Sequence, residues 1–322
     1  MTGTTGDAPD PAVVAPDPAV VAPDPAVDAG TVRVACCQLA PRLGDVEANR
    51  AASLAAIEAA ARQGAHVVVL PELVVTGYAF TDAAEARAVA EPVGPVTAAS
   101  GPTVTAASGP TVTAWTQAAG RLGVVVVGGL CELGADGELY NSAVIVDGSG
   151  LRAAHRKTHL WDREKLIFTP GEAGPPVVDL AGVRIGVMIC YEVEFPEYVR
   201  LAGLAGADLL CVPANWPRSP RPAGERPMEV VRVQAAAGAN RIFIAAADRA
   251  GAERGVDWVG GSVIVDPDGW PLAGPDPGDH ELTLLADCDL SRARTKTISD
   301  HNDVLADRRP ALYGPILEER AP

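Results

Sequence analysis

Aromatic residues are scarce in this sequence and make up only 4% of its 322 residues. A hydrophobic core must therefore be aliphatic, and a hydrophobic content of 48% is enough to build one. Basic residues are also few, with 26 Lys and Arg against 41 Asp and Glu, which leaves a net charge of −15. This balance argues against nucleic acid or an anionic membrane surface as a partner.

Long apolar runs are missing as well. No stretch approaches the ~20 residues that a membrane helix needs, and the N-terminus lacks the basic region and apolar core of a secretory signal. The six cysteines are dispersed, mostly inside apolar runs, which predicts reduced thiols. The five histidines have no spacing typical of a zinc site. From these absences we expect a cytoplasmic protein without a metal.

Two short repeats stand out. Residues 8–28 hold three seven-residue units that begin Ala-Pro-Asp-Pro-Ala-Val, and their six prolines exclude a helix or a central strand. We expect residues 1–30 to form an extended, disordered arm, and we interpret it as a solvated tail rather than a docking segment. The sequence Thr-Ala-Ala-Ser-Gly-Pro-Thr-Val occurs twice within 97–112, and we expect this duplication to lie on the surface before a helix.

Predicted strands and helices alternate along the rest of the chain. The predicted strands are 31–39, 66–70, 124–128, 140–146, 184–189, 207–212, 241–246, 261–265 and 281–286, and the predicted helices are 46–63, 113–120, 197–204 and 227–240. No linker divides 31–290, so we expect one α/β domain there. Residues 291–322 are polar and irregular, and we expect this C-terminal tail to pack on a partner subunit.

Three residues that can do chemistry lie at or after predicted strand ends. Cys190 follows the apolar run 184–189 and precedes Pro196, which suits the first turn of a helix. This order places the thiol at the carboxyl edge of a sheet, where open α/β sheets bind their ligands. Glu72 follows a second apolar strand, and Lys157 comes after the strand predicted over 140–146.

A cysteine nucleophile needs activation, because only the thiolate attacks efficiently. His155 and His159 are the candidate histidines, but neither lies in a clear triad arrangement. A carboxylate with a pKa raised by burial can take the thiol proton instead, and Glu72 is placed for that. A buried Lys157 would balance the charge and stabilise an oxyanion. Taken singly, these residues have simpler interpretations: a small core residue for Cys190, a surface turn residue for Glu72, and a solvated loop charge for Lys157.

The sequence around these residues resembles the signature blocks of the nitrilase superfamily of carbon–nitrogen hydrolases. The matching blocks are Pro71-Glu72, Arg156-Lys157-Thr158-His159-Leu160, Phe168-Thr169-Pro170-Gly171, Cys190-Tyr191-Glu192, Phe195-Pro196-Glu197, Pro213-Ala214-Asn215-Trp216-Pro217 and Asp266-Pro267-Asp268-Gly269. They follow the family's order over 31–315. The resemblance implies a four-layer α-β-β-α sandwich that dimerises through its helices and C-terminal tail, and a reaction that requires no metal or organic cofactor.

The resemblance also assigns the catalytic residues. Glu72 is implied as the general base, Cys190 as the nucleophile, and Lys157 as the group that stabilises the tetrahedral intermediate. Many members of the family carry a second glutamate four positions before a phenylalanine, and this position falls on Glu164. By itself Glu164 could equally be a surface ion-pair partner.

Three further residues are candidates for binding the substrate, which would be a small-molecule amide. The backbone N–H of Tyr191 would join Lys157 in the oxyanion site. Asn215 and Trp216 are candidates for the mouth of the pocket, although Trp216 could simply pack.

The residues after the cysteine bear on the substrate class. Nitrilases proper tend to carry Cys-Trp-Glu, whereas this chain has Cys190-Tyr191-Glu192, which favours amides over nitriles. One branch that takes N-carbamoyl amino acids has arginines soon after the cysteine, where this chain has Glu192 and Glu194. We expect these glutamates to form an acidic rim that suits a neutral or cationic substrate.

The segment 190–197 is most similar to amidases of ω-amino amides, such as 5-aminopentanamidase. We therefore predict an amidase that converts small linear aliphatic amides to acid and ammonia through a Cys thioester, with ω-amino amides preferred. The alternatives are a nitrilase or an N-carbamoyl amine hydrolase with the same Glu-Lys-Cys site, and a non-catalytic interaction protein with the same fold.

Overall fold

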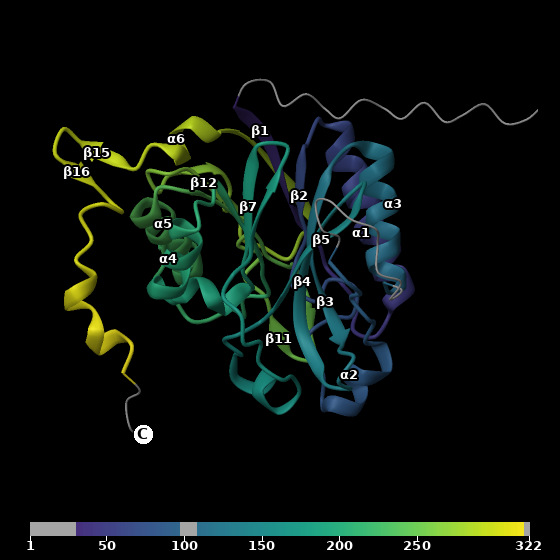
Figure 1. Ribbon diagram of the computed structural model, residues 1–322. Coiled ribbons are helices and arrows are strands. Elements are labelled where there is room, and N and C mark those ends of the chain that lie inside the picture. The colour runs from purple at the N-terminus through teal and green to yellow at the C-terminus, as the bar shows by residue number, and fades with distance from the viewer. Residues whose placement is uncertain (1–29, 97–107, 319–322) are drawn as a thin grey trace, which may run out of the picture.

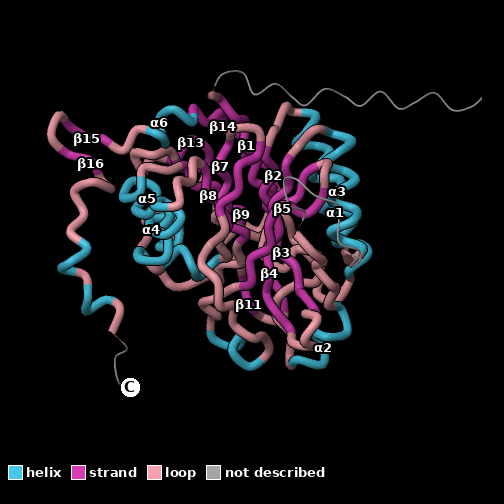
Figure 2. The backbone as a smooth tube through the Cα atoms, in the orientation of Figure 1, coloured by secondary structure: helices cyan, strands magenta, loops and turns pink. Residues whose placement is uncertain are grey.

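The structure is a computed structural model that describes residues 30–96 and 108–318. Two six-stranded sheets pack face to face, and helices cover the outer face of each sheet (Figure 1). Figure 2 shows the same arrangement, with the strands of both sheets between the two groups of helices. The four-layer α-β-β-α sandwich is therefore confirmed. The predicted arm lies outside the described residues, apart from Gly30.

The first sheet has the strand order β14-β1-β2-β3-β4-β5. Its strands are β1 (Thr31–Gln38), β2 (Val67–Val69), β3 (Val125–Leu133), β4 (Leu139–Asp147), β5 (Gly150–Arg156) and β14 (Leu282–Asp289). β1, β2 and β3 run parallel, whereas β14, β4 and β5 are antiparallel to their neighbours. Helices α1 (Val46–Arg62) and α3 (Pro110–Leu122) cover the outer face, and α2 (Ala83–Val89) lies at one end of the sheet.

The second sheet has the order β13-β12-β9-β8-β7-β6, with β7, β8 and β9 parallel. Its strands are β6 (Val177–Leu180), β7 (Val183–Val187), β8 (Leu209–Pro213), β9 (Phe243–Ala247), β12 (Val263–Val265) and β13 (Pro271–Ala273). Helices α4 (Pro196–Leu204) and α5 (Met228–Asn240) cover it (Figure 1). The shorter elements are β10 (Ala252–Glu253), β11 (Val256–Asp257), α6 (Leu290–Arg294), β15 (Thr297–Ser299) and β16 (Asn302–Asp303).

Aliphatic side chains fill both interfaces, as the composition predicts. In β2, Val67 and Val69 point into the core between the sheets, whereas Val68 packs in the core that includes Ile57 of α1. A strand buried on both faces explains the uninterrupted valine run. No helix in the described part of the chain is long and apolar enough to cross a membrane.

Several strands were not predicted from the sequence, among them β5, β6 and β13, and β5 changes where Lys157 lies. Residues 150–156 form β5, antiparallel to β4, so Lys157 follows β5 and not the strand predicted over 140–146. Leu151, Ala153 and His155 are buried, whereas the residues that alternate with them along β5 are half-buried. This period of two is typical of a strand. It was not recognised in the sequence because the arginines of this segment are also typical of a solvated loop.

Two further expectations are corrected. Residues 110–112 of the duplication form the first turn of α3, where Thr111 and Val112 are buried rather than on the surface. Residues 97–107 lie outside the described residues. The start of the tail is not irregular either, because residues 290–294 form α6, whose Arg294 pairs with the buried Asp208 at 3.2 Å.

Candidate active site

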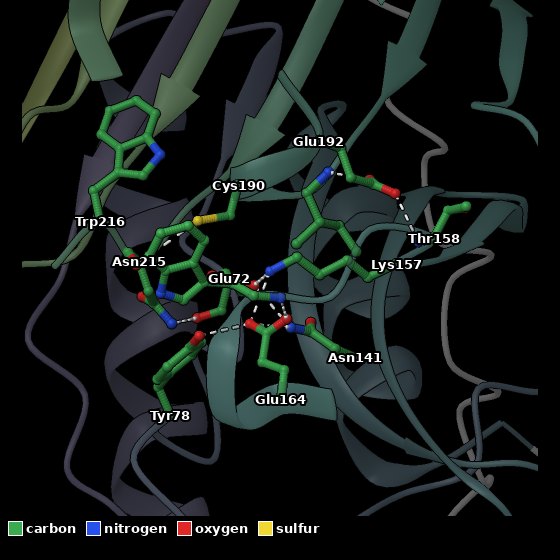
Figure 3. Close-up of polar contacts among 12 residues, drawn as sticks. Glu72, Tyr78, Asn141, Lys157, Thr158, Glu164, Cys190, Glu192, Asn215 and Trp216 are labelled. Atoms are coloured by element: carbon green, nitrogen blue, oxygen red, sulfur yellow. Dashed lines mark hydrogen bonds and ion pairs between the residues drawn. The ribbon is translucent and has the colours of Figure 1, made fainter. Parts of the chain in front are cut away.

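The candidate residues follow the carboxyl ends of strands from both sheets. Glu72 comes three residues after β2 and Lys157 directly after β5, both in the first sheet. Cys190 comes three residues after β7 in the second sheet, and Asn215 follows β8. Figure 3 shows their side chains converging on one region between the sheets, as the strand order predicts.

Lys157 is the centre of a buried group of charges. Its Nζ donates hydrogen bonds to Oε1 of Glu72 at 2.6 Å and to Oε1 of Glu164 at 2.8 Å, and all three side chains are buried (Figure 3). Glu164 lies on the 3-10 turn Asp162–Leu166, and its Oε2 accepts the N–H of Trp161 at 2.9 Å. Glu164 is thus part of the site and not a surface ion-pair partner.

Two polar neighbours of this group were not singled out from the sequence. Asn141 of β4 donates its Nδ2 hydrogens to Oε1 of Glu72 at 2.7 Å and to Oε1 of Glu164 at 3.4 Å. The hydroxyl of Tyr78 donates to Oε1 of Glu164 at 2.7 Å. An amide in a mostly apolar strand was the available signal for Asn141. Tyr78 gave no signal beyond its position in a turn.

Burial and neighbouring charges shift the pKa values of this group in opposite directions. Burial and, to a lesser extent, the charge of Glu164 raise the pKa of Glu72 to about 7, against the opposing effects of Lys157 and Asn141. For Lys157, burial alone would lower the pKa, but Glu164 and Glu72 raise it above its ordinary value. Lys157 is therefore an ammonium at neutral pH, and Glu72 has the pKa of an effective base near pH 7. Within the described residues, Oε2 of Glu72 has no hydrogen-bond partner and is available for a proton.

Cys190 begins the 3-10 turn Cys190–Glu194, with a φ of 49° in the left-handed region. A non-glycine residue rarely adopts this conformation, and such strain is common at functional sites. Its Sγ lies 3.7 Å from the backbone oxygen of Asn215. Burial and the charge of Glu72 raise the pKa of the thiol well above its usual range, and Lys157 only partly offsets them. The resting thiol is therefore protonated and needs a base during attack.

Tyr191 is the second residue of the same turn. The first N–H groups of a helical turn have no partner inside it, so its backbone N–H is available as a donor. Its ring packs edge-on against Trp161 and Phe195, with centroids 4.8 and 5.0 Å away. Tyr191 also lines a pocket of about 440 Å³, whose other lining residues are Thr158, His159, Leu160, Lys165, Phe168, Pro170 and Phe195.

Asn215 and Trp216 are buried, deeper than the pocket mouth expected from the sequence. Nδ2 of Asn215 donates to the backbone oxygen of Glu72 at 2.9 Å, which ties β8 to the loop that carries Glu72. The backbone N–H of Trp216 donates to Asp248 at 2.9 Å. Among the described residues, Oδ1 of Asn215 and Nε1 of Trp216 have no partner, so each has hydrogen-bonding capacity for a ligand.

The expected acidic rim is not formed by the residues after Cys190. Glu192 is fully buried and accepts a hydrogen bond from the backbone of Thr158 at 2.7 Å. Glu194 forms an ion pair with Arg232 at 2.9 Å. The sequence could not show this, because a tight turn can bury one carboxylate and leave another, two residues further on, beside an arginine. The prediction of a cationic substrate loses this support.

The chain matches known proteins over most of its length. The model of the carbon–nitrogen hydrolase family matches residues 33–296. A protein named nitrilase from Pyrococcus abyssi is 36% identical over 88% of this chain and 99% of its own length. An (R)-stereoselective amidase from a Pseudomonas species is 34% identical over 87% of this chain and 93% of its own length.

A solved amidase from Nesterenkonia sp. has the same fold. It superposes with a TM-score of 0.70 and 28% identity, and the match covers 90% of this chain and 98% of the amidase. In a structure of one of its variants, the acetamide moiety of fluoroacetamide is covalently added at the active-site cysteine. The names of these relatives cover both amide and nitrile substrates, so they do not establish which of the two this site takes.

Proposed function

This chain belongs to the carbon–nitrogen hydrolase family, and we propose that within it the protein is an amidase that converts small linear aliphatic amides to carboxylic acid and ammonia. It is an enzyme that acts on carbon–nitrogen bonds other than peptide bonds. One observation carries the proposal. Lys157 is held between Glu72 and Glu164 beside the strained Cys190, and this arrangement supplies a base, a cation and a nucleophile in one buried site.

In the first half of the proposed reaction, Glu72 accepts the proton of the Cys190 thiol. The thiolate attacks the amide carbon, and the negative charge moves to the amide oxygen. The ammonium of Lys157 and the backbone N–H of Tyr191 donate hydrogen bonds to this oxyanion. Glu72 then gives its proton to the leaving nitrogen, the carbon–nitrogen bond breaks, and ammonia leaves an acyl thioester on Cys190.

In the second half, Glu72 takes a proton from a water molecule, which attacks the thioester carbon. The carbon–sulfur bond breaks, the sulfur regains its proton from Glu72, and the carboxylic acid leaves. Glu164 does not exchange protons in this scheme. Its carboxylate keeps Lys157 charged and oriented, and Tyr78 and Asn141 hold Glu164 in place.

The amide preference is supported by Tyr191 after the nucleophile and by the two amidases among the relatives. The preference for ω-amino amides is supported only by the motif over 190–197. The test is ammonia release from purified protein with valeramide, 5-aminopentanamide, valeronitrile and N-carbamoylbutylamine. We expect the amides to give the highest kcat/KM, and Cys190→Ala to abolish turnover while retaining the fold. Preferred turnover of the nitrile would overturn the amidase proposal.

A nitrilase is the second candidate, since the Pyrococcus abyssi relative carries that name. The same experiment separates the two activities by which substrate is consumed, because valeramide and valeronitrile give the same products. A nitrilase would release valeric acid and ammonia from valeronitrile without accumulating valeramide. Carbon dioxide from the carbamoyl compound would indicate the third activity.

We also propose that the enzyme is a cytoplasmic homodimer. All six cysteines lie in the described residues and are free, which suits a reducing compartment. Large apolar side chains are exposed on α4, α5 and the tail, in a single copy of the chain; they are Leu201, Leu204, Val231, Leu312, Ile316 and Leu317. A second subunit that covers them would bury this apolar surface. Sedimentation equilibrium with and without residues 305–322 tests the dimer and the part of the tail in it.

A further inference from the structure

Glu192 is a buried carboxylate that the reaction scheme does not use. It lies two residues after the nucleophile and is fully buried. Burial would raise its pKa, but His155 and two backbone N–H groups lower it below the ordinary value. A buried ionised carboxylate is costly unless its partners are well placed, so its contacts identify what it holds.

The carboxylate of Glu192 makes three short hydrogen bonds. Oε1 accepts the backbone N–H of Thr158 at 2.7 Å, and Oε2 accepts the backbone N–H of Ile189 at 2.7 Å. Nε2 of the buried His155 lies 2.7 Å from Oε2. Thr158 directly follows Lys157, and Ile189 directly precedes Cys190. One side chain therefore holds the backbone neighbours of two residues of the proposed reaction, and Figure 3 shows its bond to Thr158.

The two segments that Glu192 joins come from different sheets. Lys157 follows β5 of the first sheet, whereas Cys190 follows β7 of the second. Backbone ladders fix each segment within its own sheet: the N–H of Lys157 bonds to Asn141 in β4, and the N–H of Met188 bonds to Cys211 in β8. Among the described residues, both hydrogen bonds between 155–158 and 189–194, from His155 and from Thr158, are made by the Glu192 carboxylate.

The turn that carries the thiol also needs support. A left-handed conformation at a residue such as Cys190 is strained and persists only when the surroundings enforce it. The backbone N–H of Ile189, the residue before the turn, donates to the carboxylate of Glu192. This bond closes the turn in the manner of a capping box. Glu192 thus fixes both the conformation of Cys190 and its place relative to Lys157.

We infer that Glu192 is a positioning residue for the hydrolysis, because its carboxylate sets the separation between the Cys190 thiol and the Lys157 ammonium across the two sheets. This inference rests on the proposed function. The two groups must contact opposite ends of the same substrate carbonyl, so a displacement of about 1 Å would lower turnover by about 10²-fold. His155, which lies in β5, assists through its hydrogen bond to Oε2 of Glu192.

The matched substitution is Glu192→Gln, with Glu194→Gln as its control on the same turn. Gln keeps the shape of Glu192, but its side-chain NH₂ replaces one of the two accepting oxygens. This NH₂ group cannot accept the hydrogen bond of the backbone N–H that it would face. We expect Glu192→Gln to lower kcat about 10²-fold with KM within about threefold of the wild type. Glu194→Gln removes only the ion pair with Arg232, and its kcat should stay within about threefold.

Alkylation of Cys190 by iodoacetamide, followed by peptide mass spectrometry, supplies a readout that needs no substrate. Glu192→Gln should slow this alkylation at least tenfold, whereas Glu194→Gln should not. A folded Glu192→Gln protein with wild-type kcat and alkylation rate would overturn the inference. If Glu192→Gln does not fold, His155→Gln decides: loss of kcat at constant KM supports the inference, and an unchanged kcat overturns it. Absence of ammonia release from the wild type would instead contradict the proposed function. The alkylation comparison would still test whether Glu192 positions Cys190.

Discussion

Gly129 of β3 packs directly against the backbone of Glu72. Its N–H donates to the backbone oxygen of Pro71 at 3.1 Å, and its own oxygen accepts the N–H of Val74 at 3.1 Å. A Cβ atom at Gly129 would lie 2.6 Å from Cα of Glu72 and 2.6 Å from the backbone nitrogen of Leu73. Gly129→Ala therefore displaces the backbone of Glu72, the proposed base, directly.

The size of the displacement follows from these distances. Ordinary contacts of a Cβ atom begin at 3.4 Å, so the backbone of Glu72 would have to move by about 0.8 Å. Backbone atoms cannot turn aside as a flexible side chain can, and the hydrogen bonds on both sides resist the movement. We expect kcat/KM to fall about 10²-fold and the free energy of unfolding to fall by about 1–3 kcal/mol from overpacking.

Ammonia release measures the first effect, and urea unfolding followed by circular dichroism measures the second. The control is Gly174→Ala, since a Cβ there meets only a methyl group of Leu201, at 3.8 Å. This control should keep wild-type activity and stability. Full activity in a folded Gly129→Ala protein would mean that the position of Glu72 is not critical, and it would refute Glu72 as the base.

Three shorter predictions follow from the same structure. Lys157→Met leaves Glu72 and Glu164 buried without their cation, so we expect loss of turnover and a drop of about 3–5 kcal/mol in the free energy of unfolding, measured with urea. Because burial raises the pKa of Glu72 to about 7 and its protonated form cannot accept the thiol proton, kcat/KM should fall about tenfold per pH unit below pH 7, and a flat profile from pH 5 to 7 would contradict this. Gly238→Ala, in the last turn of α5 and with no contact closer than 3.5 Å, should raise the free energy of unfolding by about 0.5–1 kcal/mol without changing kcat.

Much of the fold could be predicted because its signals are local. The valine run of β2 and the Ala-rich α1 fall where the sequence places them, each with ends shifted by a residue or so. β5 could not be recognised as easily, since its half-buried arginines mask the alternation of buried residues. A strand at the edge of a sheet keeps polar side chains, and periodicity alone does not separate it from a loop.

The site was predictable in part for a different reason. Motif spacing identified Glu72, Lys157 and Cys190 as candidates, and strand order alone implies that they meet at the carboxyl edges of the sheets. Hydrogen-bond partners from distant segments could not be predicted in this way. Asn141 enters the site from an antiparallel strand, and Glu192 turns away from the surface on which an acidic rim was expected. Both depend on the packing of two sheets, which leaves no pattern within either segment.

The buried charges explain why two glutamates and not one accompany Lys157. A single carboxylate would have to neutralise the ammonium and also act as the base, and a strong ion pair would lower its pKa and make it a poor base. Here Lys157 pairs with both carboxylates: the charge of Glu164, which Tyr78 and Asn141 hold in place, raises the pKa of Glu72, and Oε2 of Glu72 stays free of partners among the described residues. Lys157 then remains charged through every proton transfer of Glu72. In the proposed reaction the oxyanion therefore forms beside a cation that is already in place, and neither group has to reorganise as the charge develops.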